Sequence, residues 1–264
     1  MRFIRTNLPL IGIVYIVAAA VAIAVFAAPL LVLAIPAVLL AALAADAIFR
    51  PGSSLLYPTV KHGPRDRKRV ALSFDDGPDP EVTPRVLDAL AQAGARATFF
   101  VIGQSLAAHP ELANRIVADG HALGNHSWRH SRWQNFYLMR KSLREIERGE
   151  QAIAAVTGNP LPPTYRPPMG LKSPPLARAA YRRKLTLIAW SLHSRDTRTR
   201  DPERIARRVL KKIRAGDIVL MHDGHDRPGR HRCACAEAVS LILEGVREKG
   251  LTCVTVPELL GLPQ

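Results

Sequence analysis

Cysteine and aromatic residues are both scarce in this chain of 264 residues. There are three cysteines, and Cys233 and Cys235 lie too close together to bridge each other comfortably, so no disulfide framework is expected. We interpret all three, including Cys253, as core residues of a helix and a strand. Aromatic residues make up 6% of the chain and no nucleic-acid-binding motif occurs, which argues against a nucleic-acid partner despite the net charge of +15.

Charged side chains are absent from Leu8 to Ala45, a run dominated by Ala, Val, Leu and Ile. This run is too long for a cleaved signal peptide, whose apolar region usually has about 7–15 residues. As one straight helix it would be roughly 57 Å long, against a hydrocarbon core of about 30 Å. Two spans fit that length better, and Pro29 lies near the middle. We therefore predict a transmembrane segment over residues 1–50, folded as a two-helix hairpin; a single anchor helix followed by an interfacial segment is the alternative.

Basic residues flank the apolar run on both sides. Arg2 and Arg5 precede it, and a basic linker is predicted over residues 51–67. Because cytoplasmic flanks are enriched in Lys and Arg, a hairpin with both ends in the cytoplasm is favoured, whereas a single span would place one basic flank outside. The predicted location is the membrane, with the face that carries the domain left open.

Beyond the linker, short apolar runs alternate with helical patterns. Strands are predicted over residues 70–74, 97–102, 122–124, 164–166, 186–190, 218–221 and 252–256. Helices are predicted over residues 83–93, 109–119, 135–157, 173–183, 202–214 and 236–249. This alternation is typical of an α/β domain with a parallel sheet, either closed as a barrel or open. No second domain boundary appears, so residues 68–264 are predicted to form one domain.

Polar side chains gather where these predicted strands end. They are, in chain order, Asp75, Asp76, His126, His130, Arg166, Asp196 and His222. In parallel βα architectures the carboxyl ends of the strands share one face, where active sites lie. Residues that are distant in the sequence are therefore expected to converge.

A metal site is the first chemistry that this pattern indicates. His126 and His130 are four residues apart, which places two imidazoles within reach of one ion, and Asp75 or Asp76 can complete the site. Because side chains alternate along a strand, the two carboxylates should face different targets. The alternatives are a chance pair of surface histidines and an ordinary Asp-Gly-Pro turn.

Two further segments favour acid and oxyanion chemistry. Arg166 precedes two prolines that stiffen the backbone, so the Met169 N–H could point at a developing oxyanion. His222 ends an apolar strand, a suitable position for a general acid. The alternatives are a rigid loop with a surface arginine and a histidine of the core.

The order of SFDDGP, HSWRH, RPPMG, a strand ending near Asp196, and LMH resembles the metal-dependent polysaccharide deacetylases of carbohydrate esterase family 4. The resemblance covers roughly residues 68–260. It implies a distorted (β/α) barrel with fewer than eight strands, about seven here. It also implies hydrolysis of N-acetyl groups on amino sugars, with a metal-bound water as the nucleophile.

The resemblance also implies a role for each residue at a matching motif position. Asp75 would be the catalytic base, oriented by Arg166. The metal ligands, usually for Zn²⁺, would be Asp76, His126 and His130. His222 would be the acid, tuned by Asp196, and the Met169 N–H would hold the oxyanion.

Two motifs depart from the family pattern. Met169 stands where many members carry a Tyr, so a backbone donor remains but an aromatic contact with sugar is lost. The fourth motif usually reads Asp-x-x-Asp-Trp, whereas this chain has His193 at the first Asp, keeps Asp196, and has Thr197 at the Trp. These departures bear on substrate identity more than on reaction type.

The leading hypothesis is a membrane-anchored N-deacetylase of an amino-sugar polysaccharide or oligosaccharide. A variant of it would act on a lipid-linked amino sugar at the bilayer surface. A hypothesis from another class is a non-catalytic membrane module that binds anionic glycan or lipid through the basic residues between 204 and 214. Membrane lipid is an expected partner in all three.

Overall fold

The computed structural model describes residues 8–158, 164–225 and 233–262, without the side chains of residues 8–11, 26–31, 33 and 233. The chain divides into two compact units, Met1–Asp46 and Ala47–Gln264. The predicted sites all lie in the second unit.

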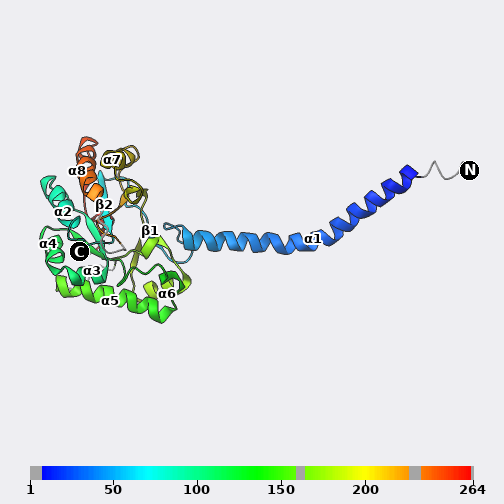
Figure 1. Cartoon of the computed structure of the whole chain (residues 1–264), viewed down its shortest axis with the longest axis horizontal. Helices are drawn as coiled ribbons and strands as arrows, with labels where there is room; N and C mark the ends of the chain where they lie inside the picture. Colours follow the sequence, from blue (N-terminus) through cyan, green and yellow to red (C-terminus); the bar gives the residue numbers. More distant parts are fainter. Residues whose placement is uncertain (1–7, 159–163, 226–232, 263–264) are drawn as a thin grey trace, which may run out of the picture. The chain divides into compact units, whose positions relative to one another are not determined.

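From residue 8 on, the first unit consists of α1 (Leu8–Phe49), one continuous helix of 42 residues (Figure 1). The predicted two-helix hairpin is therefore wrong. Pro29 removes only one backbone donor, and its neighbours Ala28 and Leu30 are good helix formers with no glycine or asparagine to make a turn. Among the described residues, which leave out part of the side chains of α1, no helix is long and apolar enough to cross a membrane. The transmembrane segment thus rests on the sequence alone.

In its described residues, the second unit is built on one sheet of nine strands, and the strands there pair in parallel. The strands are β1 (Thr59–Val60), β2 (Arg69–Asp75), β3 (Thr98–Val101), β4 (Ala122–Asn125), β5 (Thr164–Tyr165), β6 (Thr186–Ile188), β7 (Leu192–His193), β8 (Ile218–His222) and β9 (Thr252–Cys253). Eight of them follow the order β1-β6-β5-β4-β3-β2-β8-β7, and β9 pairs with β2. The predicted distorted barrel is confirmed, but it has more strands than seven, because the sequence pattern did not indicate the two-residue strands β1 and β7.

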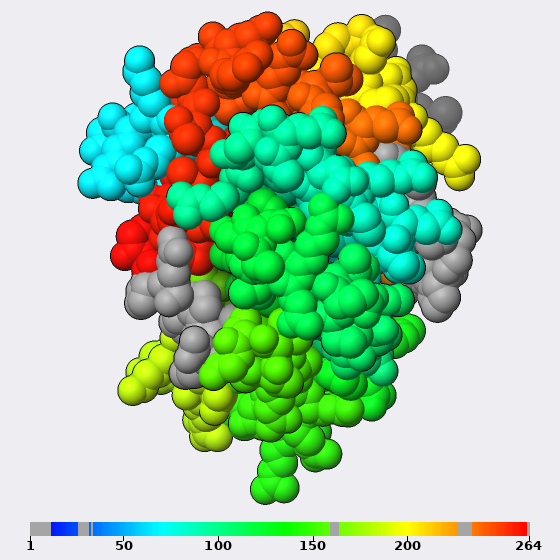
Figure 2. Space-filling model, turned by 90° about the vertical axis from the view of Figure 1, so that its left-hand side faces the viewer, coloured from blue at the N-terminus to red at the C-terminus, as the bar shows by residue number. Residues whose placement is uncertain are grey.

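Helices cover the outside of this sheet (Figure 1). They are α2 (Thr83–Gln92), α3 (Gly103–Ala108), α4 (Pro110–Ala118), α5 (Met139–Thr157), α6 (Pro174–Arg182), α7 (Pro202–Leu210), α8 (Cys233–Glu248) and α9 (Val256–Leu260). Figure 2 shows one face of the unit closed over by such helices, with α8 at the top and α5 below. The largest hydrophobic cluster lies between β2, β3 and β8 on one side and α2, α7 and α8 on the other. Burying both faces of a parallel sheet in this way fixes the strand ends that carry the polar residues.

Residues 51–67 are part of the barrel domain and do not form the predicted linker. Thr59 and Val60 of β1 pair with β6. The buried Lys172 donates from Nζ to the carbonyl oxygens of Pro51 (2.7 Å) and Ser53 (2.5 Å). The domain therefore begins near Ala47 rather than at residue 68. Backbone pairing and backbone acceptors of this kind leave no hydrophobic periodicity in the sequence.

The interpretation of the cysteines as core residues is confirmed for the two whose side chains are described. Cys235 in α8 and Cys253 in β9 are buried and free. Burial raises the pKa of the Cys235 thiol well above its ordinary value and that of Cys253 to about 12. The Cys233 side chain lies outside the described part.

Candidate active site

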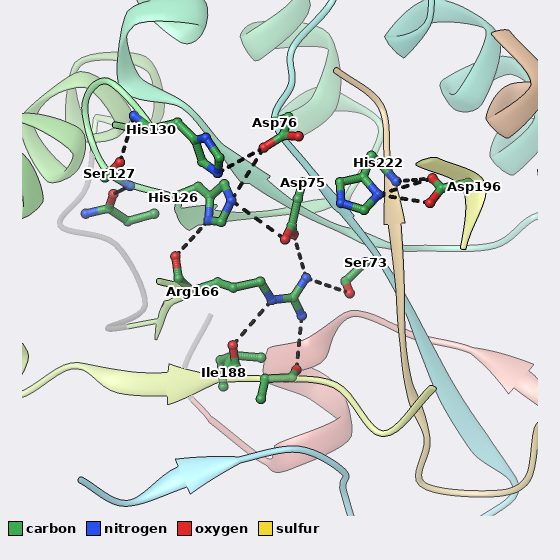
Figure 3. A network of polar contacts seen from close by, with 12 residues as sticks. Ser73, Asp75, Asp76, His126, Ser127, His130, Arg166, Ile188, Asp196 and His222 are labelled. Carbon is green, nitrogen blue, oxygen red and sulfur yellow. Dashed lines mark hydrogen bonds and ion pairs between the residues drawn. The ribbon is translucent and has the colours of Figure 1, made fainter. Parts of the chain in front are cut away.

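The two adjacent carboxylates lie at the carboxyl end of β2 and face different partners, as alternation along a strand predicts (Figure 3). Asp75 is the last residue of β2 and points toward Arg166. Asp76 has a φ of 74°, in the left-handed region, and its carboxylate points toward His126 and His130. Both carboxylates are buried.

Asp76, His126 and His130 form a cluster whose ligand atoms all lie within 4.8 Å of one another. Asp76 Oδ1 is 3.6 Å from His126 Nε2 and 3.4 Å from His130 Nε2. His126 Nδ1 lies 2.7 Å from the carbonyl oxygen of Arg166, which can only accept, so Nδ1 donates and the Nε2 lone pair faces Asp76. Two imidazoles and one carboxylate fit a divalent ion with an open coordination position.

A tight loop after β4 places the two histidines. Asn125 Oδ1 accepts from the N–H of Ser127 (2.8 Å), and Ser127 Oγ accepts from the N–H of His130 (3.0 Å). Ser127 and His130 both have positive φ, at 71° and 51°. His126 and His130 are therefore brought together by a tight loop and not by a regular helical turn. Their imidazoles converge, as predicted from the four-residue spacing.

The histidines around Asp76 lower the pKa of its carboxyl group. Burial alone would raise the pKa of Asp76, but the hydrogen bond to His126 and the charges of His130 and His222 outweigh it and lower the pKa below its ordinary value. Asp76 is therefore a carboxylate at neutral pH, which is the form that can ligate a cation.

Arg166 holds Asp75 from beneath the pocket. Its side chain is fully buried, and Nη1 donates to Asp75 Oδ1 (2.6 Å) and Ser73 Oγ (3.0 Å). Nε and Nη2 donate to the carbonyl oxygens of Ile188 (3.3 Å) and Ala189 (3.2 Å). Every nitrogen of the guanidinium therefore has a partner, and Asp75 Oδ2 is left on the side of His126 Nε2, 3.7 Å away (Figure 3).

His222 ends β8 and is bound to Asp196. Asp196 Oδ2 accepts from the backbone N–H of His222 (2.7 Å), and Oδ1 lies 3.0 Å from His222 Nδ1. Ser194 Oγ also donates to Asp196 Oδ1 (2.9 Å). Because Nδ1 faces the carboxylate, Nε2 is the ring nitrogen on the side away from Asp196.

A pocket of about 220 Å³ joins these groups. Its lining comprises Asp75, Asp76, His126, His130, Met169, Gly170, Trp190, His193, Leu220 and His222. Of the eight residues predicted for the site, six line the pocket, while Arg166 and Asp196 lie buried behind it. Met169 has a φ of 58° and is 53% exposed, at the pocket mouth.

The sequence did not identify His193 and Trp190 as pocket residues. β7 has only two residues, and His193 stands where the resemblance leads one to expect an aspartate. The sequence offered one signal for His193: it is a histidine shortly before Asp196, near a strand end. Ser73, Asn125 and Ser127 were also missed, because a polar residue that orients another by one hydrogen bond leaves no spacing pattern.

Comparison with known proteins gives one consistent family. A family model described as polysaccharide deacetylase matches residues 62–188. A peptidoglycan-N-acetylglucosamine deacetylase of Bacillus cereus is 36% identical over 203 residues, covering 75% of this chain and 90% of that protein. A chitooligosaccharide deacetylase of a Bradyrhizobium species is 39% identical over 176 residues, 66% of this chain and 78% of that protein. A crystal structure of a peptidoglycan N-acetylglucosamine deacetylase superimposes with a TM-score of 0.72 at 29% identity, covering 77% and 92%.

Proposed function

Because the chain belongs to the polysaccharide deacetylase family, carbohydrate esterase family 4, we propose that it removes N-acetyl groups from the N-acetylglucosamine units of peptidoglycan or of chitooligosaccharides. The observation that carries the proposal is the meeting of three groups in one pocket: the Asp76–His126–His130 cluster, the Asp75–Arg166 pair and the His222–Asp196 pair.

Asp76, His126 and His130 would hold the metal, and their donor set favours Zn²⁺. A divalent ion there supplies a Lewis acid that polarises the amide carbonyl and makes water a better nucleophile at neutral pH. The carbonyl of Arg166 fixes the His126 ring so that its Nε2 is the ligating atom. The same residue thus orients both a metal ligand and Asp75.

Asp75 would act as the general base. Arg166 occupies Oδ1, so Oδ2 is the oxygen directed to the pocket and able to accept the proton of the attacking water. Three further donations, to Ser73 Oγ and to the carbonyl oxygens of Ile188 and Ala189, hold the guanidinium in place, and its donation to Oδ1 holds the carboxylate. This fixed position is what a base needs to act without first rearranging.

His222 would act as the general acid at the leaving amine. Asp196 binds the ring at Nδ1, which leaves Nε2–H to donate to the nitrogen as the carbon–nitrogen bond breaks. Asp196 also accepts the backbone N–H of His222, so ring and backbone are held by one carboxylate. The N–H of Met169 would donate to the developing oxyanion from the pocket mouth.

Acetate release is the test. The full-length protein in detergent is incubated with N-acetylglucosamine oligomers and with peptidoglycan strands, once with added zinc and once after chelator treatment. We expect zinc-dependent release that is lost in Asp75→Asn and kept in Asp66→Asn, which changes an exposed carboxylate. Release that survives in Asp75→Asn, or that ignores the chelator, contradicts the proposal.

We also propose that residues 8–45 attach the protein to a membrane. The support is the absence of any charged side chain in this run. Sedimentation with membranes that is lost on deletion of residues 1–46 is the expected result, and reporter fusions after residue 49 decide the face. An intact protein that stays in the supernatant contradicts the attachment. The lipid-linked variant loses the support of the hairpin, which α1 does not form.

A further inference from the structure

Three large apolar side chains are exposed after the loop that carries the two histidines. Trp133, Phe136 and Leu138 are 69%, 78% and 80% exposed, and they lie in and beside the short helical turn η1 (Gln134–Phe136). The ring centroids of Trp133 and Phe136 are 5.8 Å apart, so these two side chains contact each other. None of the three lines the pocket. We call these three residues the η1 surface, because large apolar side chains that gather in the open commonly mark a binding surface.

Hydrogen bonds connect η1 with the pocket mouth and with the first residues of the domain. Asn135 Oδ1 accepts from the N–H of Ser173, in the loop after β5 (3.0 Å). In the same loop the N–H of Lys172 donates to the carbonyl oxygen of Ile48 (3.1 Å). Phe49, next to Ile48, is another exposed aromatic residue. Three segments that are distant in the sequence therefore meet on this part of the domain.

The chain enters the domain at the same place. The apolar run ends at Ala45, whereas Ala47 already belongs to the second unit and is buried there. Consecutive Cα atoms are about 3.8 Å apart. A bilayer that holds residues 8–45 therefore cannot lie far from the segments that contact Ile48, and η1 adjoins those segments.

The three segments are rich in basic residues and contain no acidic residue. Residues 47–65, 129–144 and 164–184 have no Asp or Glu. Lys141 Nζ lies 3.6 Å from the centroid of the Tyr137 ring, and Tyr137 stands between two residues of the η1 surface. Five basic residues of the middle segment are exposed, namely Arg129, Arg132, Arg140, Lys141 and Arg144.

The acidic residues that follow in α5 have basic partners. Glu145 is buried and accepts from the backbone N–H of Arg129 (3.0 Å). Arg183 binds Glu150 (3.0 Å between Nη2 and Oε2) and lies 3.9 Å from Glu147. Each of these carboxylates thus already has an arginine beside it, and the charge around η1 remains positive.

This composition fits a lipid surface better than a glycan. The hydroxyl groups of a sugar need acceptors as well as donors, and residues 129–144 offer no carboxylate. Phe136 and Leu138 have no polar atom in their side chains. Trp, Phe and Leu next to Lys and Arg are the usual composition of a segment that lies in the interface of an anionic bilayer.

We propose that the η1 surface inserts into the headgroup region of a bilayer that contains anionic phospholipid, while the basic residues of 129–144 bind the lipid phosphates. It is a second membrane contact, beside residues 8–45. The inference rests on the membrane attachment proposed above and does not depend on the deacetylase activity. It places the pocket mouth beside the bilayer, because Met169 lies in the same loop as Lys172 and Ser173.

Tryptophan quenching by brominated lipid tests the insertion. The full-length protein is reconstituted into vesicles of equal parts phosphatidylcholine and phosphatidylglycerol with brominated acyl chains. Trp133 is exposed, whereas Trp128 and Trp190 are half-buried, so we expect strong quenching that is mostly lost in Trp133→Phe. Quenching should also weaken when phosphatidylglycerol is replaced by phosphatidylcholine. Quenching that is unchanged in Trp133→Phe overturns the insertion, and quenching that ignores the lipid charge overturns the role of the basic residues.

A double variant tests the apolar side chains while Trp133 stays as the reporter. Phe136→Asn combined with Leu138→Asn should still sediment with the vesicles, because residues 8–45 are unchanged, but it should lose most of the quenching. Leu241→Asn, which changes an exposed leucine of α8, is the matched control and should keep the wild-type quenching. A double variant that is quenched as strongly as the control overturns the proposal.

Sedimentation and acetate release, measured on the same samples, separate this inference from those above. Protein that sediments and releases acetate, but whose Trp133 is not quenched, overturns the η1 surface alone. Protein that does not sediment with the vesicles contradicts the attachment by residues 8–45 and this inference together. Fluorescence of Trp133 that responds to N-acetylglucosamine oligomers in detergent, without quenching by lipid, would assign the surface to the glycan and also overturn the proposal.

Discussion

The two sides of the pocket are built in different ways. On the side of β2, β4 and β5, the side chains of Asp75, Asp76, His126 and Arg166 are buried, and each contacts at least two other polar groups. On the side of β7 and the loop after β5, Met169 is 53% exposed and Arg195 is exposed. The metal-binding residues and the base are thus held by buried polar contacts, whereas the residues on the other side stand on exposed loops.

This difference predicts where substitutions will be costly. A change on the buried side should damage stability and catalysis together, because the same contacts serve both. A change on the exposed side should alter substrate preference or even stabilise the fold.

Arg166→Met should have the largest effect. It removes four donated hydrogen bonds and leaves the Asp75 carboxylate buried without its counter-charge. We expect the free energy of unfolding to fall by about 3–5 kcal/mol, with loss of acetate release. Urea denaturation of the variant beside Arg85→Met measures this, and a loss as small as that of the control contradicts the proposed role of the buried pair.

His222→Gln should lower kcat by about 10²–10⁴-fold, the usual contribution of a general acid. The metal ligands are untouched, so the zinc content should stay at the wild-type level. Acetate release and bound zinc are measured in the same preparation. A variant that loses zinc as well would mean that His222 supports the metal cluster instead of donating a proton.

Asp223 offers a test of the buried side by pH. Its side chain is fully buried beyond β8, and Thr83 Oγ1 donates to its Oδ2 (2.7 Å). Burial raises its pKa to about 7, against about 3.9 in an unfolded chain. The folded state therefore holds this proton more tightly, and stability should fall as the pH rises from about 4 to about 7, by at most about 4 kcal/mol.

Urea denaturation of the metal-free protein across this pH range measures that loss. Asp223→Asn has no carboxyl proton to lose, and its amide oxygen can still accept from Thr83, so its stability should change less over the same range. Parallel pH curves for the two proteins would contradict the assignment.

Met169→Gly should have the smallest effect, and in the opposite direction. Glycine adopts a φ of 58° without steric cost, so relief of strain should raise the free energy of unfolding by up to about 1 kcal/mol. The exposed side chain gives little packing in return. Thermal denaturation measures the gain, and a destabilisation above 1 kcal/mol would show that Met169 packs more tightly than its exposure indicates.

The buried side was predictable from the sequence residue by residue. Asp75 and Asp76 follow the apolar run of β2, and His126 and Arg166 belong to motifs of fixed spacing, although Arg166 follows only the two-residue β5. The exposed side was predictable only in part. His193 ends a strand of two residues, and its hydrogen bond with Arg195 depends on a backbone angle that no residue type announces.

The N-terminal residues show a second limit on what the sequence could predict. The apolar run predicted helix correctly, but composition alone did not distinguish one long helix from a hairpin, and Pro29 did not make a turn. Residues 51–67 are basic and lack a hydrophobic periodicity, so they were interpreted as a linker. They join the barrel through β1 and the backbone acceptors of Lys172, and both depend on partners more than a hundred residues away.

The most direct test of this division is to measure bound zinc and acetate release in the same samples of wild type, His126→Ala and His193→Asn. We expect zinc in the wild type and in His193→Asn at equal stoichiometry, with release from the neutral oligomer in both. We expect neither zinc nor release in His126→Ala. Zinc retained in full by His126→Ala, or lost from His193→Asn, would contradict the placement of the chemistry on the buried side.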